Sequence, residues 1–445
     1  MTSWHIPAPL ATQINRLGSL LVARLQNFFN MVFIGLLLTR ERRRTATSWF
    51  RAVRIGREYQ RAYRAIHAVG RDVVVMSTQM LLDVVRSPAV AHEQRLCFTL
   101  DDTPSQRYGP CVEGAGIHHN PTPGPSNQAF VYGHVWVTLA CLVHHPEHGA
   151  ISLPLRSELY VREKDVPQLP KDYQWEFRTK LEQAVDLMDW LGLWLGPKGK
   201  ALWLVADGAY AKQPVLAAAR RNNITMVSRL RKDAALRSLP EPAPTGKRGR
   251  PRKYCTKTIS LAKRAGQKNG WITETMILYG KKVTKTYKTF LATWGPAGGV
   301  IRVVLVKEED GWRAYFCTDP NATPAQILEL VADRNSLEQT FKDAKEIWGA
   351  GQQQLRNLHA NLGAWHMNLW AYTMVELWAW EQPESQLVDR SASPWDDEPR
   401  RPSHLDRRKA LLAQTLRAEF QAAQVGCGQK RKLRDLAERL LQLAA

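Results

Sequence analysis

The sequence lacks a long uninterrupted apolar run, paired cysteines and an internal repeat. Its longest apolar region, residues 17–38, contains Arg24, Gln26, Asn27 and Asn30, and therefore predicts a buried helix instead of a membrane span. The cysteines are scattered between positions 97 and 427, and none forms a Cys-x-x-Cys pair. This scatter excludes a disulfide framework or a zinc knuckle and indicates the reduced thiols of a cytoplasmic protein.

Acidic residues are scarce relative to basic ones. The 445 residues include 62 Lys and Arg against 41 Asp and Glu, which gives a formal net charge of +21. Such an excess favours a polyanionic partner, of which nucleic acid is the commonest and an anionic membrane the alternative. A hydrophobic content of 44% excludes a disordered chain, and the length allows several domains.

Many basic residues lie near the N-terminus, where residues 1–92 predict a helical DNA-binding domain. Between positions 40 and 64, arginines such as Arg43 and Arg44 are interleaved with aromatic residues, and few acids oppose them. One interpretation is a solvated helix face over an aromatic core. We favour contacts with the DNA backbone, because this charge exceeds what solubility requires.

The remaining sequence predicts an α/β core that is interrupted by a β-rich insertion. Residues 93–228 form the first part of the core, in which the expected elements are strands over 95–103, 130–145 and 149–161, a helix over 173–195, a strand over 201–210, a helix over 211–222 and a strand over 224–228. Residues 229–322 contain a basic loop and antiparallel strands, residues 323–380 return to helices of the core, and residues 381–445 form a linker and a basic helical tail.

Three carboxylates occupy positions that suit chemistry. Asp102 ends one predicted strand, Asp207 ends another, and Glu338 lies on the helix after the insertion. If they converge, their oxygens form a hard ligand set for Mg²⁺, or for Mn²⁺ in its place, and two such ions serve phosphodiester chemistry. Each residue alone has an ordinary explanation, which is a turn or cap for the aspartates and an i, i+4 ion pair for the glutamate.

The helix that carries Glu338 also carries a row of cations. Arg334, Glu338, Lys342 and Lys345 follow one another at intervals of four, four and three, so they share one face of the helix. A solvated row of ion pairs is the ordinary interpretation. Beside metal-binding carboxylates, the same row predicts contacts to the phosphates of a DNA strand.

Three motifs resemble those of DDE transposases of the IS4-like superfamily, with the IS701 family as the most similar group. They are Asp-Asp-Thr at 101–103, Val-Ala-Asp-Gly-Ala-Tyr at 205–210 and the spacing Arg334-x3-Glu338-x6-Lys345. The stretches LDDTPSQRYGP, GAGIHHNPTPGP and YGHVWVTLA are similar to further stretches of that family. The resemblance spans roughly residues 95–375.

The resemblance implies an α/β, RNase H-like fold with a β-rich insertion, and it assigns metal ligands. The family's first aspartate directly precedes a threonine, which selects Asp102, because Thr103 follows it. Strand alternation then puts Asp101 on the opposite side. With Asp207 and Glu338, the implied set holds two Mg²⁺ ions.

The implied activity is cut-and-paste transposition, in which an element end is nicked and the freed 3′-hydroxyl attacks the other strand or target DNA. Arg334 and Lys345 are implied phosphate contacts, whereas the family's tyrosine falls on Val331 here. Relatives act within a paired complex, which implies a homodimer on double-stranded DNA. Relatives also stack a flipped base on a tryptophan of the insertion, for which Trp294 and Trp312 are candidates, with a place in the β core as the alternative.

Two smaller patterns carry separate predictions. In the insertion, Arg248, Arg250, Arg252 and Lys253 surround a Gly-Arg-Pro sequence that resembles an AT-hook, whose arginines suit the narrow minor groove of A·T tracts. The alternative is a flexible basic loop that contacts phosphates anywhere. Histidines cluster between positions 118 and 148, but their spacing lacks the ligand pairs of a zinc site, so loop or substrate contacts are the ordinary interpretation.

Two rival functions are compatible with the same features. A non-catalytic DNA-binding relative would share the basic surface, although the intact set of carboxylates argues against it. A nuclease with an RNase H-like fold and another biological role would share the metal site. Strand-joining products separate this nuclease from a transposase.

Overall fold

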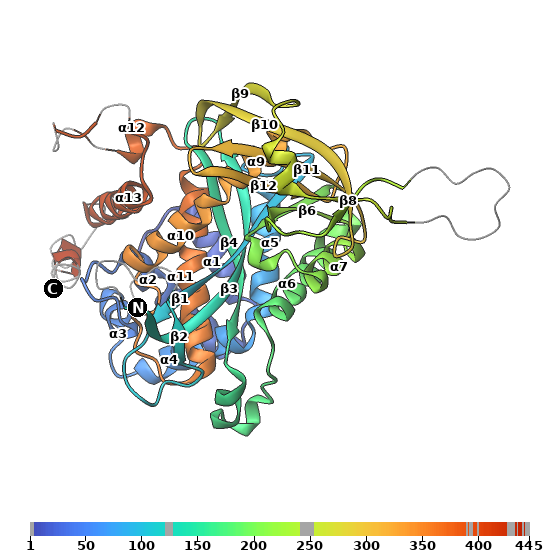
Figure 1. The fold of residues 1–445 in the computed structure, drawn as a ribbon. Helices are drawn as coiled ribbons and strands as arrows, with labels where there is room; N and C mark the ends of the chain where they lie inside the picture. Colours follow the sequence, from blue (N-terminus) through green and yellow to red (C-terminus); the bar gives the residue numbers. More distant parts are fainter. Residues whose placement is uncertain are drawn as a thin grey trace.

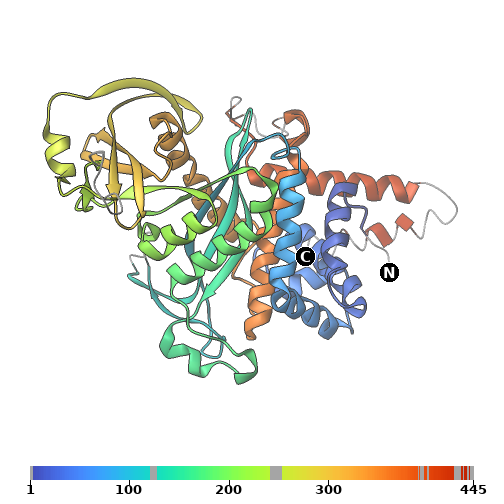
Figure 2. The same cartoon turned by 90° about the vertical axis from the view of Figure 1, so that its right-hand side faces the viewer.

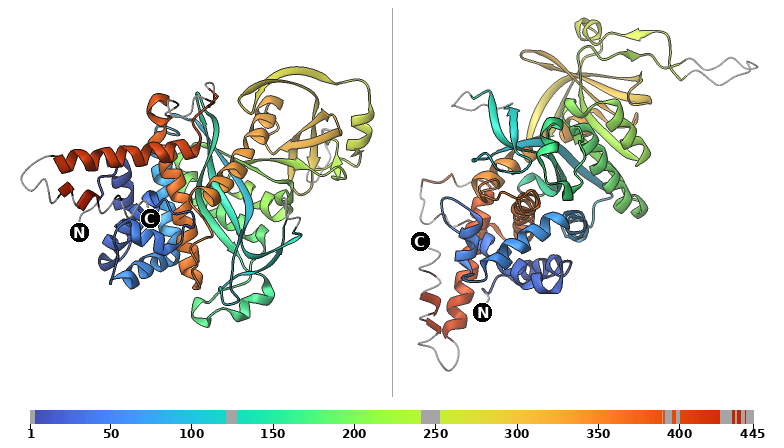
Figure 3. Two further views of the ribbon diagram at one scale, coloured as in Figure 1. Left: turned by 90° about the vertical axis from the view of Figure 1, so that its left-hand side faces the viewer. Right: turned by 90° about the horizontal axis from the view of Figure 1, so that it is seen from below.

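One mixed β-sheet forms the centre of the computed structural model, and helices cover its faces (Figure 1). The model describes residues 4–120, 128–240, 253–388, 390, 395–397, 400–424, 432–433, 435–437 and 440. The insertion and the N-terminal helices lie at opposite ends of the molecule (Figure 2; Figure 3, left). No helix in these ranges is both long and apolar enough to cross a membrane.

The N-terminal part is helical, as the sequence predicts. Its helices are α1 (Ala8–Gly18), α2 (Ala23–Leu38), α3 (Ala46–Ala52), α4 (Tyr59–Arg71) and α5 (Val73–Arg86). Phe29, Val32 and Phe33 of α2 are fully buried against the neighbouring helices, whereas Met31 and Ile34 are partly exposed. The apolar region 17–38 therefore avoids a membrane span, as predicted, but it is not one helix, because α1 ends at Gly18 and α2 begins at Ala23. Hydrophobic burial holds this part of the chain together.

The core sheet places β1 between one antiparallel and one parallel neighbour. Its strands and helices are β1 (Arg95–Gln106), β2 (Gly116–His119), β3 (Phe130–His145), β4 (Gly149–Tyr160), α6 (Lys180–Leu195), β5 (Ala201–Ala206), α7 (Gln213–Arg221) and β6 (Ile224–Leu230). β1 pairs with β3 in antiparallel and with β5 in parallel orientation, and β6 continues the parallel ladder. β4 pairs with the same strand β3.

β1 is longer than predicted, which corrects the position of Asp102. The strand continues to Gln106, because its ladder with β3 runs on to the pair Gln106↔Gly133. Its ladder with β5 stops earlier, at Leu100↔Ala206. Asp102 therefore lies within β1, although it lies just beyond the last pair of the parallel ladder between β1 and β5.

The insertion extends the core sheet instead of forming a separate one. It contains β7 (Leu236–Arg237), β8 (Thr258–Ile259), α8 (Leu261–Gly266), β9 (Ile272–Leu278), β10 (Lys281–Trp294), β11 (Gly299–Glu308) and β12 (Gly311–Cys317). β12 pairs with β6, and the order of the sheet is β2-β3-β1-β5-β6-β12-β11-β10-β7-β8, with β9 on β10. The AT-hook-like arginines Arg248, Arg250 and Arg252 lie outside the described residues, and the exposed Lys253 follows them.

The helices after the insertion return to the core. They are α9 (Pro324–Asp333), α10 (Asn335–Glu346), α11 (Leu358–Ala379), α12 (Glu384–Leu387) and α13 (His404–Gln424). Thr323 begins α9 with a capping box, in which its side chain accepts a hydrogen bond from the backbone N–H of Gln326. α12 lies in the stretch that the sequence predicted as a linker.

The helix α11 connects the sheet to the N-terminal helices. It is buried almost throughout, and its Trp365 stacks on Trp136 of β3 with ring centroids 4.7 Å apart. On its other side it crosses α4 at very short range, where Gly363 meets the backbone of Ile66. The N-terminal helices are therefore fixed against the same core that carries the carboxylates.

Candidate active site

The parallel ladder between β1 and β5 brings two of the predicted carboxylates to one edge of the sheet. The last pair is Leu100↔Ala206, and the next residue on each strand is an aspartate, Asp101 on β1 and Asp207 after β5. Polar side chains gather at this edge because the carboxyl ends of parallel strands open into a cleft. The sequence therefore places Asp207 correctly at a strand end, beside the Asp101–Asp102 pair.

Arg334 joins β1 to the helix that carries Glu338. It lies at the junction of α9 and α10, and its Nη1 is 2.5 Å from Oδ2 of Asp101 while its Nη2 is 3.0 Å from Oε1 of Glu338. The side chain of Asp101 is 18% exposed and that of Glu338 is 58% exposed. One guanidinium thus holds a partly buried and an exposed carboxylate on the same face of the sheet.

Asp102 points to the opposite face of β1. Its Oδ2 accepts a hydrogen bond from Nζ of Lys180 at 2.6 Å, and its Oδ1 accepts one from the hydroxyl of Tyr210 at 2.9 Å. This alternation is a property of any strand. The resemblance assigned Asp102 as the first metal ligand, but in this structure Asp101 is the aspartate that lies on the side of α10 and Glu338.

Two further carboxylates lie close enough to Asp101 to affect its ionisation. Burial raises the pKa of its carboxyl to about 6, Arg334 opposes this rise, and the neighbouring charges of Asp102 and Asp207 add to it. The same carboxylates, with burial as the largest cause, raise the pKa of Tyr210. A divalent cation would relieve this repulsion, and the donors are the carboxylate oxygens that Mg²⁺ and Mn²⁺ prefer. The residues therefore fit such ions.

The carboxylates are close but not gathered around one point. No three of Asp101, Asp102, Asp207 and Glu338 have donor atoms that all lie within 4.8 Å of one another. Arg334 lies between Asp101 and Glu338 and keeps their oxygens apart. The compact set that the sequence predicts is therefore not formed in this arrangement of the side chains.

The other predicted cations of α10 have different surroundings. Lys345 is turned towards β1, and its Nζ donates to Oγ1 of Thr103 at 2.6 Å. Burial lowers the pKa of Lys345 to about 8. Lys342 is exposed to solvent. Lys345 is thus placed on the face of β1 that also carries Asp101, as expected for a residue that contacts a strand at the carboxylates.

Of the arginines predicted near the N-terminus, Arg44 is fixed to the core and Arg43 is free to reach solvent. Nη1 of Arg44 donates to the backbone oxygen of Glu346 at 3.0 Å, and its backbone N–H donates to Gln352 at 3.0 Å. Burial lowers the pKa of Arg44. Arg43 is exposed. The segment before α3 therefore lies beside the end of α10.

The two candidate tryptophans of the insertion differ in exposure. Trp294 is 7% exposed and packs edge to face on Phe316, with ring centroids 5.1 Å apart, so the β-core alternative describes its place. Trp312 is partly buried against the core, and Nζ of Lys232 lies 5.2 Å from its ring centroid. Neither ring is among the groups around Asp101.

Sequence reasoning missed Lys180 and Tyr210. Tyr210 ends the motif at 205–210, so its nearness to Asp207 was visible in the sequence. Lys180 begins α6 after a capping box at Thr179 and is remote from Asp102 in the chain, so only the fold shows that the two meet.

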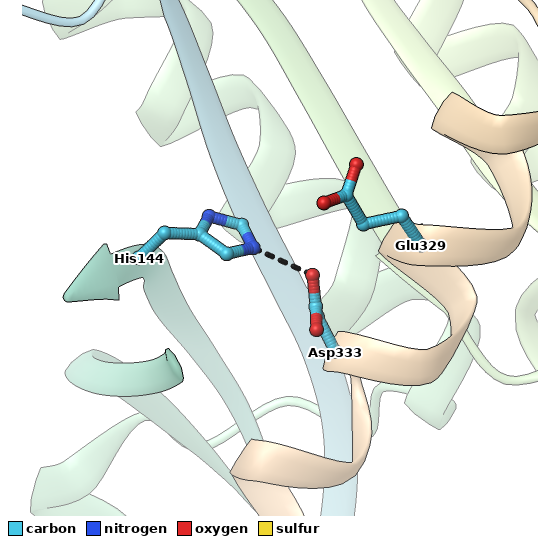
Figure 4. Close-up of side chains that lie close together, drawn as sticks. All are labelled: His144, Glu329 and Asp333. Atoms are coloured by element: carbon cyan, nitrogen blue, oxygen red, sulfur yellow. Dashed lines mark hydrogen bonds and ion pairs between the residues drawn. The ribbon is translucent and has the colours of Figure 1, made fainter. Parts of the chain in front are cut away.

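A second group of donors lies at the junction of β3 and α9 (Figure 4). Nε2 of His144 is 2.6 Å from Oδ2 of Asp333, and Glu329 points to the same place from one turn earlier on α9. Within the described residues this is the one group of three such side chains whose donor atoms all lie within 4.8 Å of one another. His144 belongs to the histidine cluster of the sequence, and its partners are carboxylates that sequence spacing did not reveal.

A family model for the DDE superfamily endonucleases matches residues 21–278. The matched segment begins at the helix α2 and ends in β9, so it includes Asp101, Asp102 and Asp207 but not Glu338. No curated protein matches the chain.

Proposed function

The chain belongs to the DDE superfamily of endonucleases, and from this premise we propose that it is a cut-and-paste DNA transposase of the IS4-like superfamily, most similar to the IS701 family. Membership in this superfamily agrees with the mixed sheet. It therefore confirms the predicted fold class, which is an α/β RNase H-like core with a β-rich insertion and a helical N-terminal part. A DDE endonuclease acts on DNA with divalent metal ions, which the excess of basic residues suits.

The observation that carries the proposal is the linkage of β1, β5 and α10 at one sheet edge. Asp101 lies next to Asp207 in the parallel register, and Arg334 connects Asp101 to Glu338. Three elements that are far apart in the chain therefore present acidic oxygens to the same opening. A nuclease that hydrolyses phosphodiesters needs such a set of oxygens beside cations that hold the substrate.

The proposed metal ligands are Asp207, Glu338 and the Asp101–Asp102 pair, with two Mg²⁺ ions that Mn²⁺ can replace. The resemblance assigns Asp102 from this pair, and the side-chain directions favour Asp101. When bound, the ions supply activation of the attacking oxygen and stabilisation of the leaving oxygen. Replacement of each aspartate separately distinguishes the two assignments.

The cations around these carboxylates have proposed roles in holding DNA. Arg334 can exchange one of its carboxylates for a phosphate oxygen, since a guanidinium binds both bidentately. Lys345, on the side of α10 that faces β1, contacts one backbone phosphate, and Lys342 contacts another from the solvent side. Transposon ends and target DNA are the proposed partners, bound by a homodimer.

The decisive test is cleavage of duplexes made from the DNA that flanks the gene, in the presence of Mg²⁺. The wild type is expected to nick the element end and then to join the 3′-hydroxyl to a second strand. Asp207→Asn should abolish both steps and keep DNA binding. Asp310→Asn is the matched control, because it removes an aspartate from the exposed turn between β11 and β12.

The products also decide between the proposal and its rivals. Cleavage without strand joining would indicate a nuclease of another role. Binding without cleavage in Mg²⁺ or Mn²⁺ would indicate a non-catalytic relative. Unchanged cleavage by Asp207→Asn would remove the carboxylate site from the proposal.

A further inference from the structure

A large cleft lies beside the carboxylates, and we infer that it holds the backbone of the DNA strand as it leaves them. This inference rests on the proposed function. The cleft has a volume of about 1150 Å³ and is bounded by the segment before α3, by the second half of β1 and its following loop, and by the loop between α10 and α11. Thr103, the residue after Asp102, is in its wall, so it opens directly at the proposed site.

The charge of the cleft is of one sign. Its walls include the cations Arg42, Arg43, Arg107, Lys345 and Arg356, and no aspartate or glutamate is among the described residues that line it. Like charges on one surface repel one another unless an opposite charge lies between them. A wall of cations without acids therefore fits an extended anion.

Two of these cations are enclosed without a carboxylate. Nζ of Lys345 donates to the hydroxyl of Thr103, and Arg107, which is 5% exposed, donates to Nδ1 of His134 at 3.0 Å and to the backbone oxygen of Gly351 at 2.6 Å. Burial lowers the pKa of Arg107 to about 10, as it lowers that of Lys345. A buried charge without an opposite charge destabilises the fold, so a bound phosphate would supply the negative charge that these two cations lack.

The remaining groups of the walls also suit a nucleic acid backbone. The amides of Asn120, Gln352 and Gln354 are hydrogen-bond donors, and the ring of Tyr108 is 72% exposed at the cleft. Cations and amides bind phosphate and sugar, whereas an exposed aromatic ring can stack on a base.

The position of the cleft matches the path of a strand. Lys345 lies two helical turns beyond Glu338, which is about 10 Å along α10, or roughly three times the axial rise of one nucleotide in a duplex. A strand held with one phosphate at the carboxylates would therefore present its next phosphates to Lys345, and then to the arginines at the far wall. This places the N-terminal arginines and the catalytic helix on one DNA path.

The first experiment measures DNA affinity against salt concentration, with Ca²⁺ in place of Mg²⁺ to prevent cleavage. Arg43→Gln/Arg356→Gln removes one exposed cation from each of two walls, and the slope of log affinity against log salt should fall by about two. The matched control is Arg86→Gln/Arg221→Gln, which removes two exposed arginines from the ends of α5 and α7 and should leave the slope unchanged. Equal slopes for the two double variants would overturn the inference.

The second experiment uses a cysteine that the chain already has. Cys111 is an exposed thiol in the wall of the cleft. The substitution Arg86→Cys adds a reference thiol at an exposed position at the end of α5. Bound duplex should slow alkylation of Cys111 by a maleimide several-fold more than alkylation of this reference thiol. Equal slowing of the two, or none at Cys111, counts against the inference. Both readouts are independent of cleavage, so a wild type that protects Cys111 but never cuts would contradict only the proposed function.

Discussion

Asp101→Asn is expected to make the protein more stable and, at the same time, inactive. The carboxyl of Asp101 has a pKa of about 6 in the fold against an ordinary 3.8, chiefly because it is buried. The folded chain therefore binds this proton more readily than the unfolded chain, and the fold loses stability as the pH rises from 3.8 to about 6. Above that pH range the ionised carboxyl lowers the stability of the fold by its full amount.

The size of this cost follows from the pKa difference. The ionised carboxyl of Asp101 lowers the free energy of unfolding by at most about 3 kcal/mol at pH 7, and this figure already includes the opposing attraction of Arg334. The melting temperature of Asp101→Asn should thus exceed that of the wild type by a few degrees at pH 7, and should not exceed it at pH 3.5.

The catalytic effect has the opposite sign. If Asp101 is a metal ligand, its loss removes several kcal/mol of charge stabilisation, and about 4 kcal/mol corresponds to a cleavage rate lower by roughly a thousandfold. Asp102→Asn, which leaves Lys180 in contact with solvent, should lower the rate by about tenfold or less. Initial rates of Mg²⁺-dependent cleavage, with Asp310→Asn as control, measure both effects.

Two results would refute this reasoning. A lower melting temperature of Asp101→Asn at pH 7 would show that its charge stabilises the fold. Wild-type cleavage by Asp101→Asn, together with a large loss in Asp102→Asn, would return the metal-ligand role to Asp102, as the resemblance assigns it.

Three further predictions concern other parts of the molecule. The hydrogen bond to Asp333 raises the pKa of His144, so the pair stabilises the fold at low pH, and this contribution disappears as the pH rises through the raised pKa. His144→Ala should therefore lower the melting temperature at pH 5.5 and hardly at pH 8.5. An equal loss at both pH values would contradict the pairing. The amine of Lys345 has a pKa of about 8, so a phosphate that binds beside it should cause proton uptake when DNA binds at pH 8.5. Calorimetry in two buffers measures this uptake, which should be absent in Lys345→Met. Gly363→Ala would place a Cβ 2.0 Å from a backbone oxygen of α4, so it should destabilise the chain by about 1–3 kcal/mol in thermal unfolding. In the control Gly266→Ala the new Cβ meets no atom within 4 Å, so this variant should be as stable as the wild type.

The secondary structure of the core was largely predictable, because its patterns are local. The sequence predicts a strand over 201–210 that runs into Asp207, and the structure has β5 over Ala201–Ala206 with Asp207 after it, whereas Gly208–Tyr210 form a short 3-10 helix. The end of β1 was not predictable. Its length depends on a ladder with β3 that extends beyond the ladder with β5, and this difference is a property of the sheet.

The sequence also showed which residue types could form a site, but not how they face one another. Arg334 and Glu338 are one helical turn apart, so their ion pair follows from spacing alone. The contact of Arg334 with Asp101 and that of Lys180 with Asp102 join positions that are remote along the chain. Only the packing of α10 and α6 on opposite faces of β1 decides which aspartate meets which cation.

By itself, the sequence determined that the chain is basic, that it has α/β order with a β-rich insertion, and which carboxylates follow or lie in strands, since charge and periodicity are local properties. The tertiary structure decided that the segment with Arg43, the end of β1 and the loop after α10 enclose one cationic cleft, and that Asp101 and Asp102 have different partners. These features depend on long-range packing, because a side chain's neighbours across a sheet are set by strand register and helix docking and not by distance along the chain.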